Sequence, residues 1–124
     1  MARKTTAEAM ARAWDYLVAH ACDAEPTRGA AAQVGIGCQP FIRAFRKRYG
    51  LTPHRFVCHC RVRRAGRLLA ESERPVTDIA VTSGYCDGSH LVRAFRAAFG
   101  MTPTQFRRAC RTRRNGVRRD GRRG

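Results

Sequence analysis

The sequence has few acidic residues, almost no lysine and no long apolar segment. Only 9 of its 124 residues are Asp or Glu, against 25 Lys and Arg, and the formal net charge is +16. All of these cations except Lys4 and Lys47 are arginines, whose guanidinium groups bind phosphates and guanine edges through paired hydrogen bonds. No stretch approaches the ~20 apolar residues of a membrane span, so we expect no membrane partner. The composition therefore indicates an anionic polymer as the partner.

Signals for secretion, metal binding and catalysis are also absent. The first residues, Met1–Glu8, contain no apolar h-region, which predicts a cytoplasmic protein in a reducing environment. His54 and Cys58 stand four residues apart, but two ligands do not make a zinc site. The sequence holds no Ser/His/Asp arrangement, carboxylate pair or phosphate loop, so we expect no enzyme, no metal and no cofactor. Free thiols are expected at Cys22, Cys38, Cys58, Cys60, Cys86 and Cys110.

One pattern occurs twice, 50 residues apart. Residues 41–56 return as residues 91–106 with eight identities. In each copy a glycine, Gly50 or Gly100, suits the left-handed position that ends a helix. A Thr-Pro pair follows, which offers an N-cap and a first helical residue that needs no amide hydrogen. Each copy therefore predicts a helix, a sharp stop and a new helix. The identical pairs are Arg43/Arg93, Ala44/Ala94, Phe45/Phe95, Arg46/Arg96, Gly50/Gly100, Thr52/Thr102, Pro53/Pro103 and Phe56/Phe106.

Extended outward, these signals predict an all-α chain of seven helices. We expect them at about residues 6–21, 28–34, 38–49, 53–72, 76–83 and 89–99, and from residue 103 onward. An apolar stripe at helical spacing marks the first helix: Met10, Trp14 or Ala13, Leu17 and Ala21. The apolar side of the long helix 53–72 consists of Cys58, Val62, Ala65 and Leu69. Its arginines are expected on a solvated face, with contact between some of them and DNA as the alternative: Arg61, Arg63, Arg64 and Arg67.

Two helix pairs form helix-turn-helix units, at about residues 27–50 and 76–100. In such a unit the first helix braces the second, which places its N-terminal residues in a major groove. Phe45, Phe56, Phe95 and Phe106 are expected in the core and not as base-stacking platforms. The first pair is packed by Ala31, Val34, Ile36, Phe41 and Phe45. The second is packed by Ile79, Ala80, Leu91 and Phe95, with its turn at Gly84.

The outward residues of each reading helix are the candidate DNA contacts. Arg bonds guanine and Gln bonds adenine bidentately, so Gln39, Arg43 and Arg93 are suited to base readout. Arg46, Lys47 and Arg96 lie one turn further on, where phosphates are closer. His90 is either a contact or a partly buried spacer. The predicted DNA-binding set is Gln39, Pro40, Arg43, Arg46, Lys47, Gly88, Ser89, His90, Arg93 and Arg96.

Residues 75–107 resemble the signature of the AraC/XylS transcriptional regulators. The resemblance covers about residues 7–108 and is closer in the second copy than in the first. It implies a DNA-binding domain, residues 1–108, whose two helix-turn-helix units are joined by the long linker helix from Pro53 to about Ser72. The reading helices, 38–49 and 89–99, would enter successive major grooves of double-stranded DNA, ~34 Å apart. The resemblance also implies a sequence-specific regulator that recruits RNA polymerase at the bacterial nucleoid.

The first helix-turn-helix unit departs from this family pattern. Gly37-Cys38 replaces the usual Ser N-cap, a weaker cap by up to about 1 kcal/mol. Pro40 lies within the first turn, where it is tolerated. Gly29 and Ala30, in place of a leucine, offer little to pack. We therefore expect the first unit to be less stable, or to bind less specifically, than the second.

Three alternatives stay open. The basic residues 109–124 contain too little apolar surface to fold, which predicts a disordered tail that either adds phosphate contacts or has no role. Most AraC/XylS members carry a separate sensor or dimerisation domain. The chain is therefore either a small activator that binds DNA as a monomer or a detached half of a longer effector-responsive regulator. The competing class is a non-specific basic nucleic-acid-binding protein, which would not need matched cores and turns.

Overall fold

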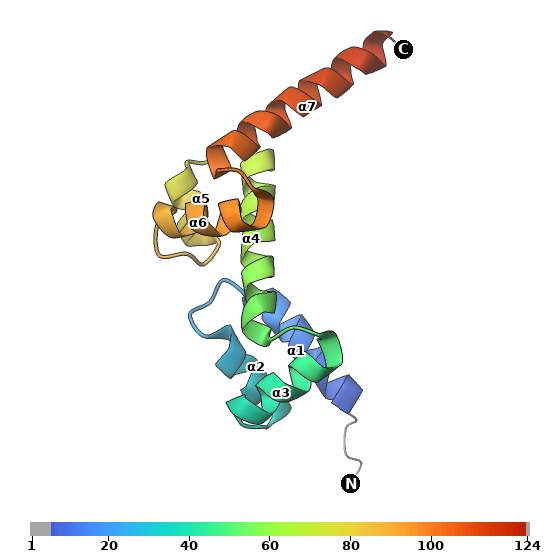
Figure 1. Ribbon diagram of the computed structural model, residues 1–124, viewed down its shortest axis with the longest axis vertical. Helices are drawn as coiled ribbons and strands as arrows, with labels where there is room; N and C mark the ends of the chain where they lie inside the picture. The colour runs from blue at the N-terminus through green and yellow to red at the C-terminus, as the bar shows by residue number, and fades with distance from the viewer. Residues whose placement is uncertain (1–5, 124) are drawn as a thin grey trace. The chain divides into compact units, whose positions relative to one another are not determined.

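The computed structural model describes residues 6–123 of the chain, with side chains through residue 114 (Figure 1). Within that range the chain forms seven helices and no strand, as predicted. It divides into two compact units, Met1–Arg61 and Val62–Gly124, called here the first and second units. None of the described helices is long and apolar enough to span a bilayer. The helices are α1 Thr6–His20, α2 Pro26–Val34, α3 Cys38–Tyr49, α4 Pro53–Glu71, α5 Val76–Thr82, α6 Gly88–Phe99 and α7 Pro103–Arg123.

The repeated Gly and Thr-Pro residues end and restart the helices as predicted. Gly50 and Gly100 have φ values of 82° and 73°, and their N–H groups donate to the carbonyls of Arg46 and Arg96 at 2.7 and 2.8 Å. Thr52 then accepts the Arg55 N–H at 3.3 Å. Its counterpart in the second copy accepts the Gln105 N–H at 3.1 Å. Each copy thus closes one helix and opens the next within three residues.

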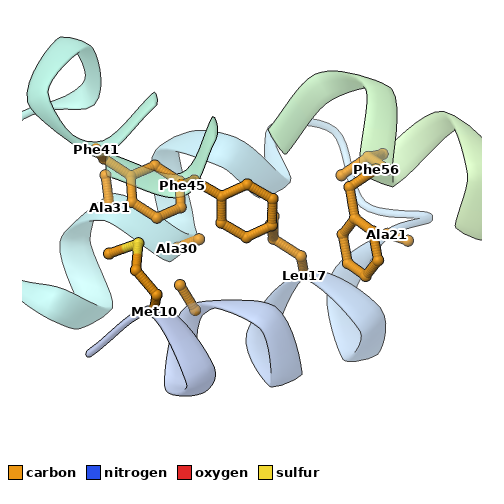
Figure 2. Packing of buried hydrophobic residues seen from close by; sticks show 10 residues of the cluster. Met10, Leu17, Ala21, Ala30, Ala31, Phe41, Phe45 and Phe56 are labelled. Atoms are coloured by element: carbon orange, nitrogen blue, oxygen red, sulfur yellow. The ribbon is translucent and has the colours of Figure 1, made fainter. Parts of the chain in front are cut away.

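The core of the first unit lies between α1, α2, α3 and the start of α4. Figure 2 shows Met10 and Leu17 of α1 facing Phe41 and Phe45 of α3, all of them buried. The predicted α1 stripe is therefore confirmed, with Ala13 fully buried and its neighbour Trp14 partly so. Trp14 contacts three rings, with centroid separations of 4.0 Å to Phe56, 4.6 Å to Tyr49 and 6.3 Å to Phe45.

The second unit has its own core, between the second half of α4, α5, α6 and the start of α7. The four residues predicted to pack α5 against α6 are all fully buried: Ile79, Ala80, Leu91 and Phe95. Gly84 has a φ of 95°, which fits the turn assigned to it. Phe106 of α7 packs edge-on against Phe95 at 5.0 Å, so it belongs to the core as expected.

Arginine side chains close the C-terminal ends of two helices. Arg61 donates to the carbonyls of Ala21 and Asp23 at 2.6 and 3.0 Å, beyond the end of α1. Arg107 donates to three carbonyls at the end of α4, those of Leu69, Ser72 and Arg74, at 2.7 to 3.1 Å. The prediction of a solvated face on α4 was therefore wrong for Arg61, although Arg63, Arg64 and Arg67 are exposed. Carbonyls at helix ends need donors, and these arginines supply them.

Two packing predictions were wrong. Ile36 is 41% exposed, because the chain reverses at left-handed Gly35 before it reaches Ile36. Cys58 is exposed and Val57 is buried in its place. A single apolar stripe fails on α4 because its first turns pack into the core of the first unit and Val62, Ala65 and Leu69 into that of the second.

Small residues in α2 also serve a purpose that the sequence analysis missed. A Cβ at Gly29 would lie 2.8 Å from two ring carbons of Tyr16, and Ala30 is fully buried. Gly29 therefore lets α2 approach α1 closely, and a larger side chain would separate the two helices. The expectation that Gly29 and Ala30 give little to pack is wrong for this reason.

The C-terminal segment differs from the predicted disordered tail. Helix α7 continues from Pro103 to Arg123. Arginine is a good helix former, and a helix that is already nucleated extends at little further entropic cost. The anchored first turns, which hold Phe106 and Arg107, supply that nucleus.

Candidate nucleic-acid interface

The N-terminus of α6, the predicted reading helix of the second unit, is closed by an aspartate. Asp87 has extended backbone angles, and its carboxylate accepts the His90 N–H at 3.0 Å. The His90 ring nitrogen Nδ1 lies 2.9 Å from the same carboxylate. The hydrogen bond from the His90 backbone, with help from its side chain, lowers the pKa of Asp87 below its ordinary value of 3.8. Sequence reasoning missed this cap, although an Asp directly before a reading helix is its typical signal.

The N-terminus of α3, the reading helix of the first unit, has no such closure. Gly37 occupies the N-cap position and makes no side-chain cap bond, which confirms the weaker cap expected from the sequence. The residue three positions later is Pro40, which has no N–H for a cap to accept. The pair Gly37 and Pro40 thus replaces the pair Asp87 and His90 of the second unit.

Equivalent positions of the two reading helices are buried, and equivalent positions are exposed. Phe41 and Phe45 of α3, and Leu91 and Phe95 of α6, are fully buried. Gly88 is partly buried, and a Cβ there would contact Thr77 at 3.7 Å. The remaining predicted contacts are exposed: Gln39, Pro40, Arg43, Arg46, Lys47, Ser89, His90, Arg93 and Arg96. Each helix therefore presents its predicted residues to solvent, and their roles toward DNA stay predictions.

These exposed cations have no anionic partner in the described part of the chain. The arginine–carboxylate pairs there involve Arg28 with Glu25 and Arg111 with Glu73, on other helices. Arg43, Arg46, Arg93 and Arg96 form none, so their charge is available to an external anion. Both reading helices therefore carry a polar, cationic outer face over an apolar inner face.

Metal ligands are not gathered at this surface. Across residues 6–123 no group of three or more His, Cys, Asp or Glu side chains is placed to hold an ion. His54 and Cys58 do share a face of α4, with Nε2 and Sγ 3.7 Å apart. None of the six cysteines, all of them within the described residues, forms a disulfide.

The helix pairs α2–α3 and α5–α6 each pack through buried apolar residues, and the second helix of each pair exposes arginines on its outer face. These two pairs define a double helix-turn-helix domain. Residues 30–109 match the family described as "Helix-turn-helix domain". The chain belongs to this family, and within it to the AraC type. A curated relative is the HTH-type transcriptional activator RhaS of Escherichia coli, 33% identical over 75 residues. That match covers 60% of this chain but only 27% of RhaS.

Solved structures share the fold. The DNA-binding domain of the global transcriptional factor AdpA, crystallised with a target DNA, is 28% identical, with a TM-score of 0.79. The match covers 86% of this chain and 96% of that one. An AraC-type regulator from Chromobacterium violaceum is 23% identical, with a TM-score of 0.77 over 85% of this chain and 94% of its own. The predicted fold, with two helix-turn-helix units, is therefore confirmed.

Proposed function

We propose that the chain is a sequence-specific transcription regulator that binds double-stranded DNA. Helix α3 and helix α6 each enter a major groove, and the two grooves are successive turns of one duplex. The observation that carries this proposal is the shared register of the two helices. Arg43 and Arg93 are exposed on the same side relative to a fully buried aromatic, Phe45 or Phe95. Arginine is the usual partner of guanine in a major groove.

The similarity to the AdpA domain supports this proposal, because that domain was crystallised with its target DNA. Unpaired arginines on both reading helices supply the charge that phosphate binding needs. Gln39 would read adenine in the first unit, and Ser89 and His90 would contact the groove edge in the second. Arg46, Lys47 and Arg96 would contact phosphates.

The remaining parts of the proposal concern the setting in which the domain works. We propose that it acts in the cytoplasm at the bacterial nucleoid, as a monomer, and that it recruits RNA polymerase. The relative RhaS is an activator, but this chain spans about a quarter of it, so an effector-sensing partner domain stays part of the hypothesis.

Selection of bound duplexes from random DNA tests the function. The selection is run at ~150 mM salt, where charge alone holds DNA weakly. We expect a motif of two blocks spaced by about ten base pairs, one for each reading helix. One block would mean that a single unit reads bases. No enrichment would contradict sequence-specific binding and favour the non-specific alternative.

A further inference from the structure

A cationic cavity lies in the first unit where α3 ends and α4 begins. Its volume is about 570 Å³. Its lining contains no acidic side chain, and half of the lining residues are arginine or histidine. The lining consists of Arg46, Gly50, Leu51, Thr52, Arg55 and His59. Arg46 and Arg55 both line this cavity, so an anion bound there would be attracted by two positive charges.

The basic side chains of this cavity have no partner of their own. Arg46, Arg55 and His59 are exposed, and none forms an ion pair or side-chain hydrogen bond with another described residue. They are therefore not held as parts of an internal salt-bridge network. The cavity also lies against the N-terminus of the 19-residue helix α4, whose dipole favours negative charge.

The backbone at this helix start lacks an acceptor that the second unit has. There the Thr102 N–H donates to Oε1 of Gln105 at 2.9 Å, and the Thr102 hydroxyl accepts the Gln105 N–H in return. The first unit has Arg55 in place of Gln105, and a guanidinium cannot accept. The Thr52 N–H consequently has no acceptor within the described chain, and only the bond from the Arg55 N–H to the Thr52 hydroxyl remains.

Of the three basic side chains that line the cavity, Arg46 is repeated in the second unit, whereas Arg55 and His59 are specific to the first. The positions equivalent to Arg46, Arg55 and His59 are Arg96, Gln105 and Ala109, so two of the three basic side chains are replaced. One repeat thus satisfies its helix start internally, and the other presents free donors and positive charge at the same place.

We propose that this cavity binds a phosphate group, and that the phosphate belongs to the DNA backbone. The Thr52 N–H and hydroxyl would donate to its oxygens from the helix start, with Arg46 and Arg55 as charged donors and His59 at the rim. The DNA source rests on the proposed function, whereas the phosphate chemistry rests on the cavity alone. Such a contact would anchor the unit whose reading helix has the weaker cap.

The variant Arg55→Gln tests the site without removing the fold. It introduces the residue of the second unit and can restore the reciprocal cap on Thr52, so thermal stability should stay equal or rise. We expect its affinity for the selected operator to fall by about fivefold to tenfold and its salt dependence to lose about one counterion. Arg63→Gln is the matched control, because Arg63 is an exposed arginine of α4 outside the cavity.

Two further arms identify the source of the phosphate. In the first, single backbone phosphates of the operator are replaced by neutral methylphosphonate. One replacement should weaken the native protein about as much as Arg55→Gln does and leave that variant almost unaffected. In the second, inorganic phosphate is titrated into the DNA-free protein and followed by ³¹P NMR. Phosphate binding that Arg55→Gln removes, without any methylphosphonate effect, would support the phosphate site and assign it a free anion.

Equal affinities of Arg55→Gln and Arg63→Gln for the operator, together with no inorganic phosphate binding, would overturn the site. This outcome is distinct from failure of the proposed function, which would show as no enriched sequence for the native protein. The titration with inorganic phosphate decides the chemistry of the cavity in either case.

Discussion

The two units of this protein build the same helix arrangement around different centres. Buried residues recur at the same spacing, with Ala13 and Leu17 in the first unit and Ala65 and Leu69 in the second. The residue after the alanine is Trp14 in one and Gly66 in the other. Trp14 fills its core with an indole that touches three rings. A Cβ at Gly66 would lie 3.8 Å from the rings of Phe95 and Phe106, so neighbouring aromatic rings fill the space there.

The helix starts differ as well, and here the second unit has the more complete set of side-chain hydrogen bonds. Asp87 and the Thr102–Gln105 pair close α6 and α7 with side chains of the second unit. In the first unit α3 begins at Gly37 without a cap bond, and α4 begins with only half of that pair. The first unit therefore depends more on its aromatic core and the second on its caps. Backbone N–H groups that no side chain caps at a helix N-terminus can donate hydrogen bonds to a phosphate. The unit with fewer caps is therefore the one better suited to bind a phosphate at a helix start.

The largest expected effect concerns Trp14. Replacing it by Ala should lower the free energy of unfolding of the first unit by about 3 kcal/mol, because the indole would leave a cavity among Phe45, Tyr49 and Phe56. Urea denaturation followed by circular dichroism measures this loss. Val18→Ala on the same helix is the control, since Val18 is 53% exposed. Equal losses for the two variants would show that Trp14 is not the centre of this core.

A smaller effect is expected from the reading helices. Arg93→Ala should weaken binding to the selected operator by about 1–3 kcal/mol and relax the preference at one base pair. Gln39→Ala and Arg43→Ala should cost less, because the uncapped start of α3 positions its side chains less firmly. Quantitative DNA binding assays on single-base operator variants measure both. Much greater losses for Gln39→Ala or Arg43→Ala than for Arg93→Ala would reverse the assignment of the stronger reader.

Local signals in the sequence predicted most of this architecture. The repeated glycines and Thr-Pro pairs act within a few residues, so the helix bounds and both reading helices could be placed from them. The partners of Arg61 and Arg107 could not, because they lie 33 to 40 residues away and are carbonyls, which carry no sequence signature. The prediction that Cys58 is buried was wrong because the two halves of α4 pack into different cores, so no single apolar stripe runs along the helix. The cavity at Arg55 has no signal in the sequence of either repeat alone, because it depends on the difference between Arg55 and Gln105 at the same structural position.

Asp87 gives the second unit a dependence on pH. Its carboxylate has a lowered pKa because it accepts the His90 N–H, so its stabilising effect is complete above the ordinary value of 3.8 and is lost as the pH falls through the lowered value. Asp87→Ala should lower the melting temperature at neutral pH, since the cap is removed. Thermal melts from about pH 2 to pH 6, which extend well below the ordinary carboxyl titration range, measure this. Asp87→Asn, which keeps a capping oxygen without the charge, should show no such pH dependence. A native melting curve parallel to that of Asp87→Asn at every pH would contradict the role of the charge.

Adding a Cβ at Gly66 should stabilise the second unit slightly. Gly66→Ala is expected to raise the free energy of unfolding by about 0.5–1 kcal/mol, because Ala favours the helix and its Cβ makes ordinary contacts with Phe95 and Phe106. Gly29→Ala in α2 is the matched control. Its Cβ would collide with the Tyr16 ring, so the same substitution should destabilise the first unit. If chemical denaturation gave both variants the same sign, the argument from local space would fail.

The smallest expected effect tests why α3 is uncapped. Gly37→Ser should change stability by a few tenths of a kcal/mol at most, although Ser is a preferred N-cap. The reason is Pro40, which has no N–H at the position where the second unit bonds Asp87 to His90. The double variant Gly37→Asp, Pro40→His supplies both acceptor and donor, so its gain should exceed the sum of the two single changes. A thermal denaturation double-mutant cycle measures this coupling. A full gain from Gly37→Ser alone would mean that the Gln39 N–H suffices, and that the first unit lacks its cap for want of an acceptor only.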